Sequence, residues 1–243
     1  MIKTLGVFLT FAALPALAQY PRTIGWNGEA WMVKKSTGKV GPGPNYFSDS
    51  ANNVWVDGNN KLHLKITKSG NQWHCAEVIR VTSSGHGTYR FYIDSSQGTG
   101  LDTLDKNAVL GLFTWNDAPD YNHRELDIEF SRWGNAADPT NAQYVVQPYG
   151  TAGNLVRFTE PPASASVHSF SWNLNDAFFK SVTGTDPATT DPVALIASHD
   201  FTSSIPLPGG EQARINLWLY RGKAPSNQKA IEIVISKFEP QLN

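Results

Sequence analysis

The sequence predicts an all-β protein of the sandwich or barrel type, for three reasons. Segments of roughly five to nine residues alternate apolar and polar side chains, clusters of Gly, Pro, Asn and Asp separate them, and helical periodicity is nearly absent. Residues 61–67 are a clear case, because Leu62, Leu64 and Ile66 share one face after a turn. The run AVLGLFTW at 108–115 is expected to be a central strand covered on both faces.

The amino terminus has the pattern of a secretory signal peptide, which we assign to residues 1–18. Lys3 precedes an apolar run at 5–17, and small residues at its end predict cleavage after Ala18. The run is shorter than the ~20 apolar residues that a membrane-spanning helix needs. We therefore expect a single domain over 19–243 that is secreted, into the periplasm or out of the cell, and not held in a membrane.

Composition favours a neutral polymer as the partner. Without residues 1–18 the chain carries 19 basic and 21 acidic side chains, a net charge of −2. Such a protein has little attraction for nucleic acid or an anionic membrane. Eight Trp and eight Tyr are many for this length, and such rings often face a wet binding surface. We expect a monomer that binds polysaccharide or oligosaccharide, with its single cysteine, Cys75, as a buried thiol.

The segment RELDIEF at 124–130 is the most informative one. Glu125, Asp127 and Glu129 alternate with apolar residues, so in a strand the three acids share one face. Neighbouring carboxylates repel one another and raise one another's pKa, which a purely structural sheet would avoid. Glycoside hydrolysis needs one carboxylate to attack the anomeric carbon and one protonated carboxyl to give the leaving oxygen a proton. The alternative is a solvated face whose acids pair with neighbouring basic side chains.

Several segments together resemble glycoside hydrolase family 16, which includes the β-1,3(4)-glucanases (lichenases and laminarinases). The resemblance is carried by the acids with SRWG at 131–134, CAEV at 75–78, SGHGTY at 84–89, VHSFSW at 167–172 and RINLWLY at 214–220. His86 stands where the family usually has Tyr. The resemblance implies a concanavalin-like β-sandwich, a jelly roll of two curved antiparallel sheets with an open cleft on the concave face.

The same resemblance implies a role for each acid. Glu125 is the expected nucleophile, Asp127 the helper that holds and tunes it, and Glu129 the general acid/base of a retaining double displacement. The expected activity is that of an endo-acting glycosidase on β-glucan-type polysaccharide. Two alternatives stay open, a catalytically silent lectin-like protein on the same scaffold and a transglycosylase.

Alternation on the strand at 213–220 predicts further residues of the cleft, because its even positions oppose an apolar core face. Trp218 offers a flat ring to a pyranose, and Asn216 offers donors and an acceptor to sugar hydroxyls, with Tyr220 on the same face. Packing between strands is the alternative for Trp218. Other substrate-binding candidates flank the acids or lie on the next expected strand: Trp115, His123, Trp133 and Gln147. Packing in the core or in a turn is the alternative for each of these four.

The sequence predicts no cofactor and no catalytic metal. Three histidines lack the spacing of metal ligands and are expected to be structural: His63, His74 and His168. Some members of the resembled family carry a structural Ca²⁺. A structural Ca²⁺ is possible here too, but loop residues such as Asp49, Asp57 and Asp138 form no recognisable calcium loop.

Overall fold

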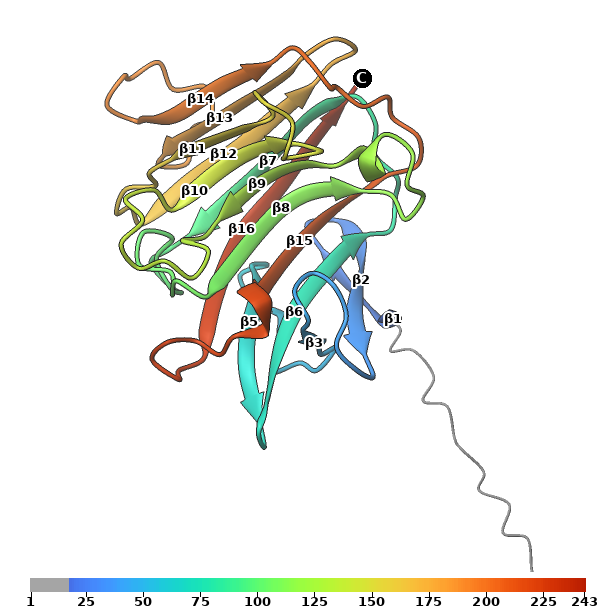
Figure 1. Ribbon diagram of the computed structural model, residues 1–243, viewed down its shortest axis with the longest axis vertical. Helices are drawn as coiled ribbons and strands as arrows, with labels where there is room; N and C mark the ends of the chain where they lie inside the picture. The colour runs from blue at the N-terminus through green and yellow to red at the C-terminus, as the bar shows by residue number, and fades with distance from the viewer. Residues whose placement is uncertain (1–17) are drawn as a thin grey trace, which may run out of the picture.

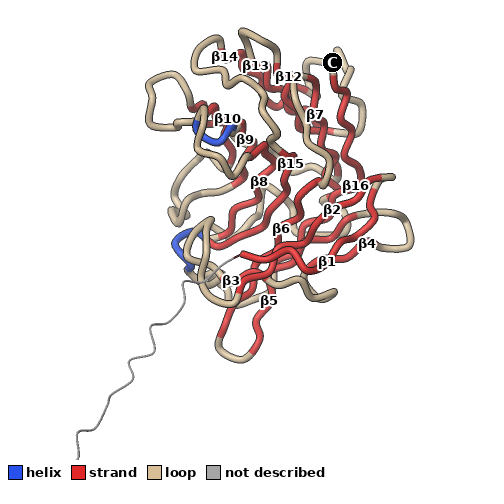
Figure 2. The backbone as a smooth tube through the Cα atoms, turned by 90° about the vertical axis from the view of Figure 1, so that its right-hand side faces the viewer, coloured by secondary structure: helices blue, strands red, loops and turns tan. Residues whose placement is uncertain are grey.

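The computed structural model describes residues 18–243, and Figure 1 shows them as two curved layers of antiparallel strands. The predicted signal peptide falls outside the described residues except for Ala18, where the first strand begins. In the described part, helical structure is confined to the short 3₁₀ turns η1 (Asn122–Arg124) and η2 (Tyr220–Gly222), as Figure 2 shows. The prediction of an all-β protein is confirmed.

The strands form a front and a back sheet, joined by the β5–β6 hairpin. The front sheet pairs, in order, β1 (Ala18–Trp26), β2 (Glu29–Ser36), β6 (Gln72–Arg80), β15 (Gln212–Leu219), β8 (Ala108–Trp115), β9 (Leu126–Phe130), β10 (Ala142–Val146) and β11 (Leu155–Phe158). The back sheet pairs, in order, β4 (Val54–Val56), β5 (Leu62–Ser69), β16 (Ile231–Leu242), β7 (Gly87–Asp94), β12 (Ala165–Trp172), β13 (Ala177–Thr183) and β14 (Leu195–Phe201). A short strand, β3 (Tyr46–Phe47), pairs in parallel with β6. This is the predicted jelly-roll sandwich.

The core lies between the two sheets and consists of the inward face of each strand. Leu126, Ile128 and Phe130 of β9 are fully buried, as their alternation with the acids predicts. Contacts such as that between the rings of Tyr144 on β10 and Phe179 on β13, 5.1 Å apart, tie the front sheet to the back sheet. Because the apolar face of β9 is committed to this core, its acids must face outward.

β8 differs from the prediction in one respect. It is buried from Ala108 to Thr114, as expected for a central strand, but Gly111, Phe113 and Trp115 line a cavity on the outer face of the front sheet. The outer face of β8 is therefore the floor of a cavity, whereas we had expected a packed layer.

Two other expectations concern buried side chains. Cys75 is fully buried in β6, and burial raises the pKa of its thiol to about 12, as expected of an apolar thiol. His168 is also fully buried, its ring nitrogens hydrogen-bond to Ser166 and Ser181 (2.8 Å each), and burial lowers its pKa to about 3.

Across the described residues, no helix has the length and apolarity that crossing a membrane would require.

Candidate active site

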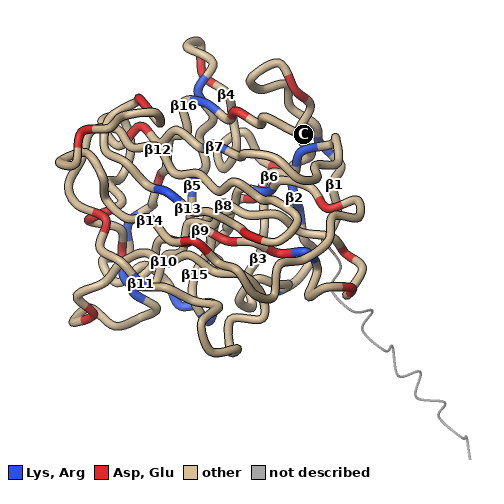
Figure 3. Tube along the Cα trace, turned by 90° about the horizontal axis from the view of Figure 1, so that it is seen from above, with Lys and Arg blue, Asp and Glu red and all other residues tan. Residues whose placement is uncertain are grey.

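The three predicted acids lie together on the outer face of the front sheet. Asp127 and Glu129 belong to β9, and Glu125 comes directly before it. The register places Glu129 between Gly111 of β8 and Gln143 of β10. Seen from above in Figure 3, acidic positions cluster along β9 in the middle of the molecule.

A cavity of about 340 Å³ contains all three carboxyls. Its lining comes from β1, β2, β6, β8, β9 and β15 and from the loops at 41–42, 117 and 125: Tyr20, Lys34, Gly41, Pro42, Glu77, Gly111, Phe113, Trp115, Asp117, Glu125, Asp127, Glu129, Arg214, Asn216 and Trp218. Three of the predicted substrate-binding residues are thus brought to the acids, namely Trp115, Asn216 and Trp218. The other four are not among the lining residues: His123, Trp133 and Gln147 each contact a lining residue, and Tyr220 contacts Trp133.

Asp127 is the most deeply buried of the three acids and is held by a glutamine. Gln147 donates a hydrogen bond from Nε2 to Asp127 Oδ2 (3.0 Å), and its own carbonyl oxygen accepts one from the Tyr149 backbone (2.9 Å). The second bond fixes which end of the Gln147 amide faces Asp127. Gln147 thus holds the carboxyl of Asp127 in place, and its predicted contact with substrate stays a prediction.

Glu129 is supported in the same way by a residue that the sequence analysis missed. Gln143 donates from Nε2 to Glu129 Oε2 (2.7 Å), while its carbonyl oxygen accepts from Trp133 Nε1 and Arg157 Nη1 (3.2 Å each). Two donors on that oxygen leave only the NH₂ group to face Glu129. The pairing of Gln143 with Glu129 across β9 and β10 is the signal that could have found it.

A left-handed turn precedes Glu125. Residues 121–124 all have positive φ, between 51° and 63°, although none is glycine. This conformation costs roughly 1–2 kcal/mol for an ordinary residue, and such strain persists where the surroundings impose it. Here Asn116 donates from its backbone to the His123 carbonyl (2.7 Å), Thr114 Oγ1 donates to the Arg124 carbonyl (2.8 Å), and the His123 ring stacks on Trp115 at 3.9 Å. The predicted sugar contact His123 thus fixes the turn and the back of Trp115.

Burial is the main cause that raises the pKa of all three carboxyls. The pKa values of Glu125 and Glu129 rise to about 8, and that of Asp127 rises well above its usual range. Like charges add to this, since Glu129 raises the pKa of Glu125 and Asp127 raises that of Glu129. A hydrogen bond with Asp127 and the charge of Arg214 lower the pKa of Glu125. Three such carboxyls cannot all ionise at neutral pH, so they share protons.

Ion pairs also line the cavity, and the pair of Lys34 with Glu77 is buried. Lys34 Nζ contacts Glu77 Oε2 at 2.7 Å and the Gly41 carbonyl at 2.9 Å. Arg214 contacts Glu77 Oε1 at 3.5 Å and Asp117 Oδ1 at 3.1 Å. The predicted site did not include these side chains, although alternation had placed Arg214 on the cleft face. Glu77 is brought beside Lys34 by the pairing of β6 with β2, and beside Arg214 by the pairing of β6 with β15.

Asn216 and Gly111 are opposite one another on β15 and β8. A Cβ at Gly111 would lie 2.5 Å from Asn216 Oδ1, so the absence of a side chain there makes room for the amide. Asn216 is 3% exposed, and among the described residues its Oδ1 has no hydrogen-bond partner. A buried acceptor without a partner, in a residue that lines a cavity, suits a ligand hydroxyl.

Trp218 lies at the boundary between cavity and core. It lines the cavity, yet it is 9% exposed and packs edge-on against Trp133 with ring centres 6.0 Å apart. Trp133 also meets Tyr220, at 5.4 Å. Tyr220 comes after the end of β15 in η2, so strand alternation does not set its direction. Trp133 therefore packs against Trp218, and Tyr220 packs against Trp133.

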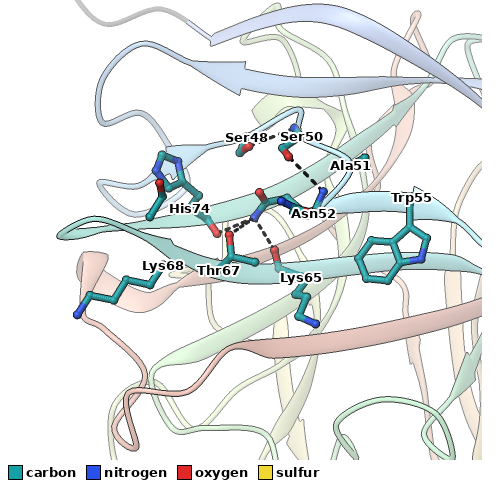
Figure 4. A pocket seen from close by; sticks show the side chains of 11 residues that line it. Ser48, Ser50, Ala51, Asn52, Trp55, Lys65, Thr67, Lys68 and His74 are labelled. Carbon is teal, nitrogen blue, oxygen red and sulfur yellow. Dashed lines mark hydrogen bonds between the residues drawn. The ribbon is translucent and has the colours of Figure 1, made fainter.

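A larger hollow, of about 740 Å³, lies beside the β5–β6 hairpin and is shown in Figure 4. Trp55, Lys65, Thr67 and His74 are among its lining residues, which in the described chain include no Asp or Glu. Asn53 in its floor already donates to the Lys65 and His74 carbonyls and to Thr67 Oγ1. Within residues 18–243, no three His, Cys, Asp or Glu side chains are grouped so that they could hold a metal ion. The cavity on β9 is thus the candidate active site.

The fold is similar to those of solved glycoside hydrolases. The β-glucanase of Bacillus licheniformis matches with a TM-score of 0.65 at 19% identity, over 94% of this chain and 98% of that one. A glycoside hydrolase family 16 protein of Mycobacterium smegmatis gives 0.62 at 18% identity, over 92% and 100%. A pseudo β-1,3-glucanase of Mycobacterium tuberculosis, also an immunostimulatory antigen, gives 0.63 at 20% identity, over 88% and 91%. No protein-family model and no curated sequence matches the chain. The resemblance predicted from sequence is confirmed at the level of the fold.

Proposed function

We propose that this protein is a glycosidase of the family 16 type, which hydrolyses internal O-glycosyl bonds of a β-glucan-type polysaccharide with retention of configuration. The observation that carries the proposal is the set of three carboxyls on one cavity floor, two of them oriented by glutamine amides. Raised pKa values make unlike protonation states available to them at the same pH, which this reaction requires. The fold shared with a β-glucanase supports the substrate class.

The first half-reaction assigns a role to each acid. Ionised Glu125 attacks the anomeric carbon while Glu129 gives its proton to the glycosidic oxygen, so that the bond to the leaving sugar breaks and a glycosyl ester forms. Asp127, protonated and held by Gln147, donates a hydrogen bond to Glu125 and keeps its carboxylate oriented. Gln143 holds Glu129 in position.

The second half-reaction returns the enzyme to its starting state. Glu129, now ionised, removes a proton from a water molecule, whose oxygen attacks the anomeric carbon and releases Glu125. If a sugar hydroxyl takes the place of water, the same step is transglycosylation. Both steps use side chains and water, so the proposal includes no cofactor.

Binding of the polymer is assigned to the cavity residues with free polar groups or flat rings. Trp115 and Trp218 offer apolar ring surface to pyranose rings, and Asn216 Oδ1 accepts from a sugar hydroxyl. A neutral polymer is consistent with the net charge, and the amino-terminal pattern supports a secreted protein that works on extracellular or periplasmic polysaccharide. The proposal takes the working form to be a monomer.

A catalytically silent carbohydrate-binding protein is the second candidate. The observation that favours it is the fold shared with a pseudo β-1,3-glucanase, because the same scaffold can evidently serve without that activity. Both candidates use the same cavity, so turnover and binding must be measured separately.

The decisive experiment compares the wild type, Glu125→Gln and Glu129→Gln on a panel that includes mixed-linkage β-glucan and β-1,3-glucan. Release of reducing ends should fall by at least about a thousandfold in Glu125→Gln, because no other carboxyl can take the place of the nucleophile. Affinity electrophoresis in the same polymers should show that binding persists. Nuclear magnetic resonance of the first product should show retained configuration.

Glu239→Gln is the matched control, since Glu239 on β16 pairs with Lys237 and is not a cavity residue. Its turnover should equal that of the wild type. Binding without turnover in the wild type, on every polymer of the panel, would establish the carbohydrate-binding protein in place of the enzyme.

A further inference from the structure

Two buried cations that line the cavity, Lys34 and Arg214, contact one and the same buried carboxylate, Glu77. Lys34 and Arg214 are each 5% exposed, and both contact Glu77, which is 1% exposed. The other acidic partner of Arg214 is Asp117, whose side chain is 80% exposed, so solvent screens that pair. The buried set formed by Lys34, Arg214 and Glu77 therefore has one surplus positive charge.

This surplus constrains the acid triplet of Glu125, Asp127 and Glu129, which lines the same cavity. An unbalanced charge away from water is costly, and a carboxyl in such a place neutralises by taking a proton. One ionised carboxyl in the triplet balances the buried charges, while two would leave a net negative charge. On the far side of the triplet, Arg157 does not alter this balance, because Asp138 pairs with it at 3.1 Å.

The side chain of Arg214 reaches toward the Glu125 end of the triplet. The backbone of Arg214 lies opposite Phe113 of β8, which in turn lies opposite Asp127. Its guanidinium extends to within 6.0 Å of the centre of the ring of Trp115, the residue that the continued register of β8 and β9 places opposite Glu125. Asp117 Oδ1 accepts from both Trp115 Nε1 (3.0 Å) and Arg214 Nη2 (3.1 Å), which holds the two side chains together. The Nε of Arg214 is buried and has no hydrogen-bond partner among the described residues.

We propose that Arg214 is a positioning residue that places the single negative charge of the acid triplet on Glu125, while Asp127 and Glu129 keep their protons. The other ionisable side chains of the cavity are Tyr20, Lys34, Glu77 and Asp117. Of these and Arg214, only Arg214 acts on Glu125, where its charge favours ionisation, whereas Arg157 acts on Glu129. The catalytic meaning of this inference rests on the proposed function. The location of the charge can be tested without any substrate.

The first test compares Arg214→Met with Arg214→Lys. Methionine removes the charge but keeps an apolar stem, and Lys34 still pairs with Glu77, so no buried carboxylate loses its last partner. We expect the acidic limb of the kcat/KM profile to move up by one to two pH units in Arg214→Met, a loss of about 10- to 100-fold on that side. Arg214→Lys should return the acidic limb to its wild-type position. In Arg214→Met, KM should change less than kcat.

Arg157→Met is the contrasting variant, because its charge acts on Glu129. It should move the alkaline limb upward and leave the acidic limb in place. Melting temperatures of all three variants check that they are folded. An acidic limb unchanged in Arg214→Met, or moved equally by Arg214→Lys, would overturn the proposal.

The second test is an infrared difference titration of the protein alone. The carboxylate signal of the triplet that appears at the lowest pH should vanish in Glu125→Gln and should appear at higher pH in Arg214→Met. If it vanishes in Glu129→Gln instead, the inference is wrong even where hydrolysis is found. If no polymer is cleaved but the titration shifts as expected, the proposed function fails and the charge assignment stands.

Discussion

Substitution of Gly111 by alanine should reduce activity without unfolding the protein. Gly111 lies in the middle of β8, between Asn216 on one neighbouring strand and Glu129 on the other. An added Cβ would point to the cavity face and meet Asn216 Oδ1 at 2.5 Å. The change therefore acts on one proposed substrate-binding group through the smallest possible side chain.

The size of the effect follows from this contact. Ordinary contact begins at 3.4 Å, so Asn216 Oδ1 must retreat by about 0.9 Å, the difference between 3.4 and 2.5 Å. A misplacement of about 1 Å in a positioning group can cost about 100-fold in rate. Overpacking of this kind costs roughly 1–3 kcal/mol of stability, less than the total stability of a typical domain. We expect kcat/KM to fall by about 10- to 100-fold in a folded variant.

The assay is kcat/KM on the best polymer of the panel, with thermal melting of each variant. Gly25→Ala is the matched control, because Gly25 also lies in a strand of the front sheet and a Cβ there would meet no atom within 4 Å. The double variant Gly111→Ala, Asn216→Ala removes the clash. It should therefore be no less active than Asn216→Ala alone.

Two results would refute this reasoning. One is a Gly111→Ala variant that is as active as Gly25→Ala. The other is a strict sum of the two single effects in the double variant, because it would show that Gly111 does not act through Asn216.

Two further predictions concern the general acid Glu129 and the ring of Trp218. Burial raises the pKa of Glu129 to about 8, so this acid keeps its proton below that pH and loses it above. The value of kcat/KM should therefore fall about tenfold per pH unit as pH rises beyond 8. A profile that stays flat to pH 10 would contradict the role of Glu129 as the acid. Trp218→Ala should weaken oligosaccharide binding by about 2- to 12-fold in calorimetry, while Trp218→Phe should keep most of the affinity. An alanine variant that no longer melts cooperatively would show that packing on Trp133 is the main role of Trp218.

Alternation within single strands was sufficient to predict the floor of the cavity. The direction of a strand side chain depends on whether its position is odd or even, so the acids, Asn216 and Trp218 could be assigned to one face without knowledge of their neighbours. All of them line the cavity. The same argument placed Leu126, Ile128 and Phe130 in the core, where the structure has them.

The walls of the cavity depend on pairing between segments far apart in the sequence, and local periodicity does not predict which strands pair. Tyr20, Lys34 and Glu77 come from β1, β2 and β6, whose register with β15 is set by contacts far apart in the sequence. Nearness to the acids in the sequence was a poor guide. His123 and Gln147 are close to them along the chain, but neither lines the cavity, and each contacts a residue that does.

The left-handed backbone at 121–124 limits which amino acids this part of the chain can accept. Its residues are constrained by backbone angle, so glycine, asparagine or aspartate should be accepted there, while valine, isoleucine or threonine should not, even where the side chain meets only water. A redesign that aims at a different polymer has more freedom at 118–120, which is exposed and has no positive φ. Substitutions there do not have to fit a left-handed backbone.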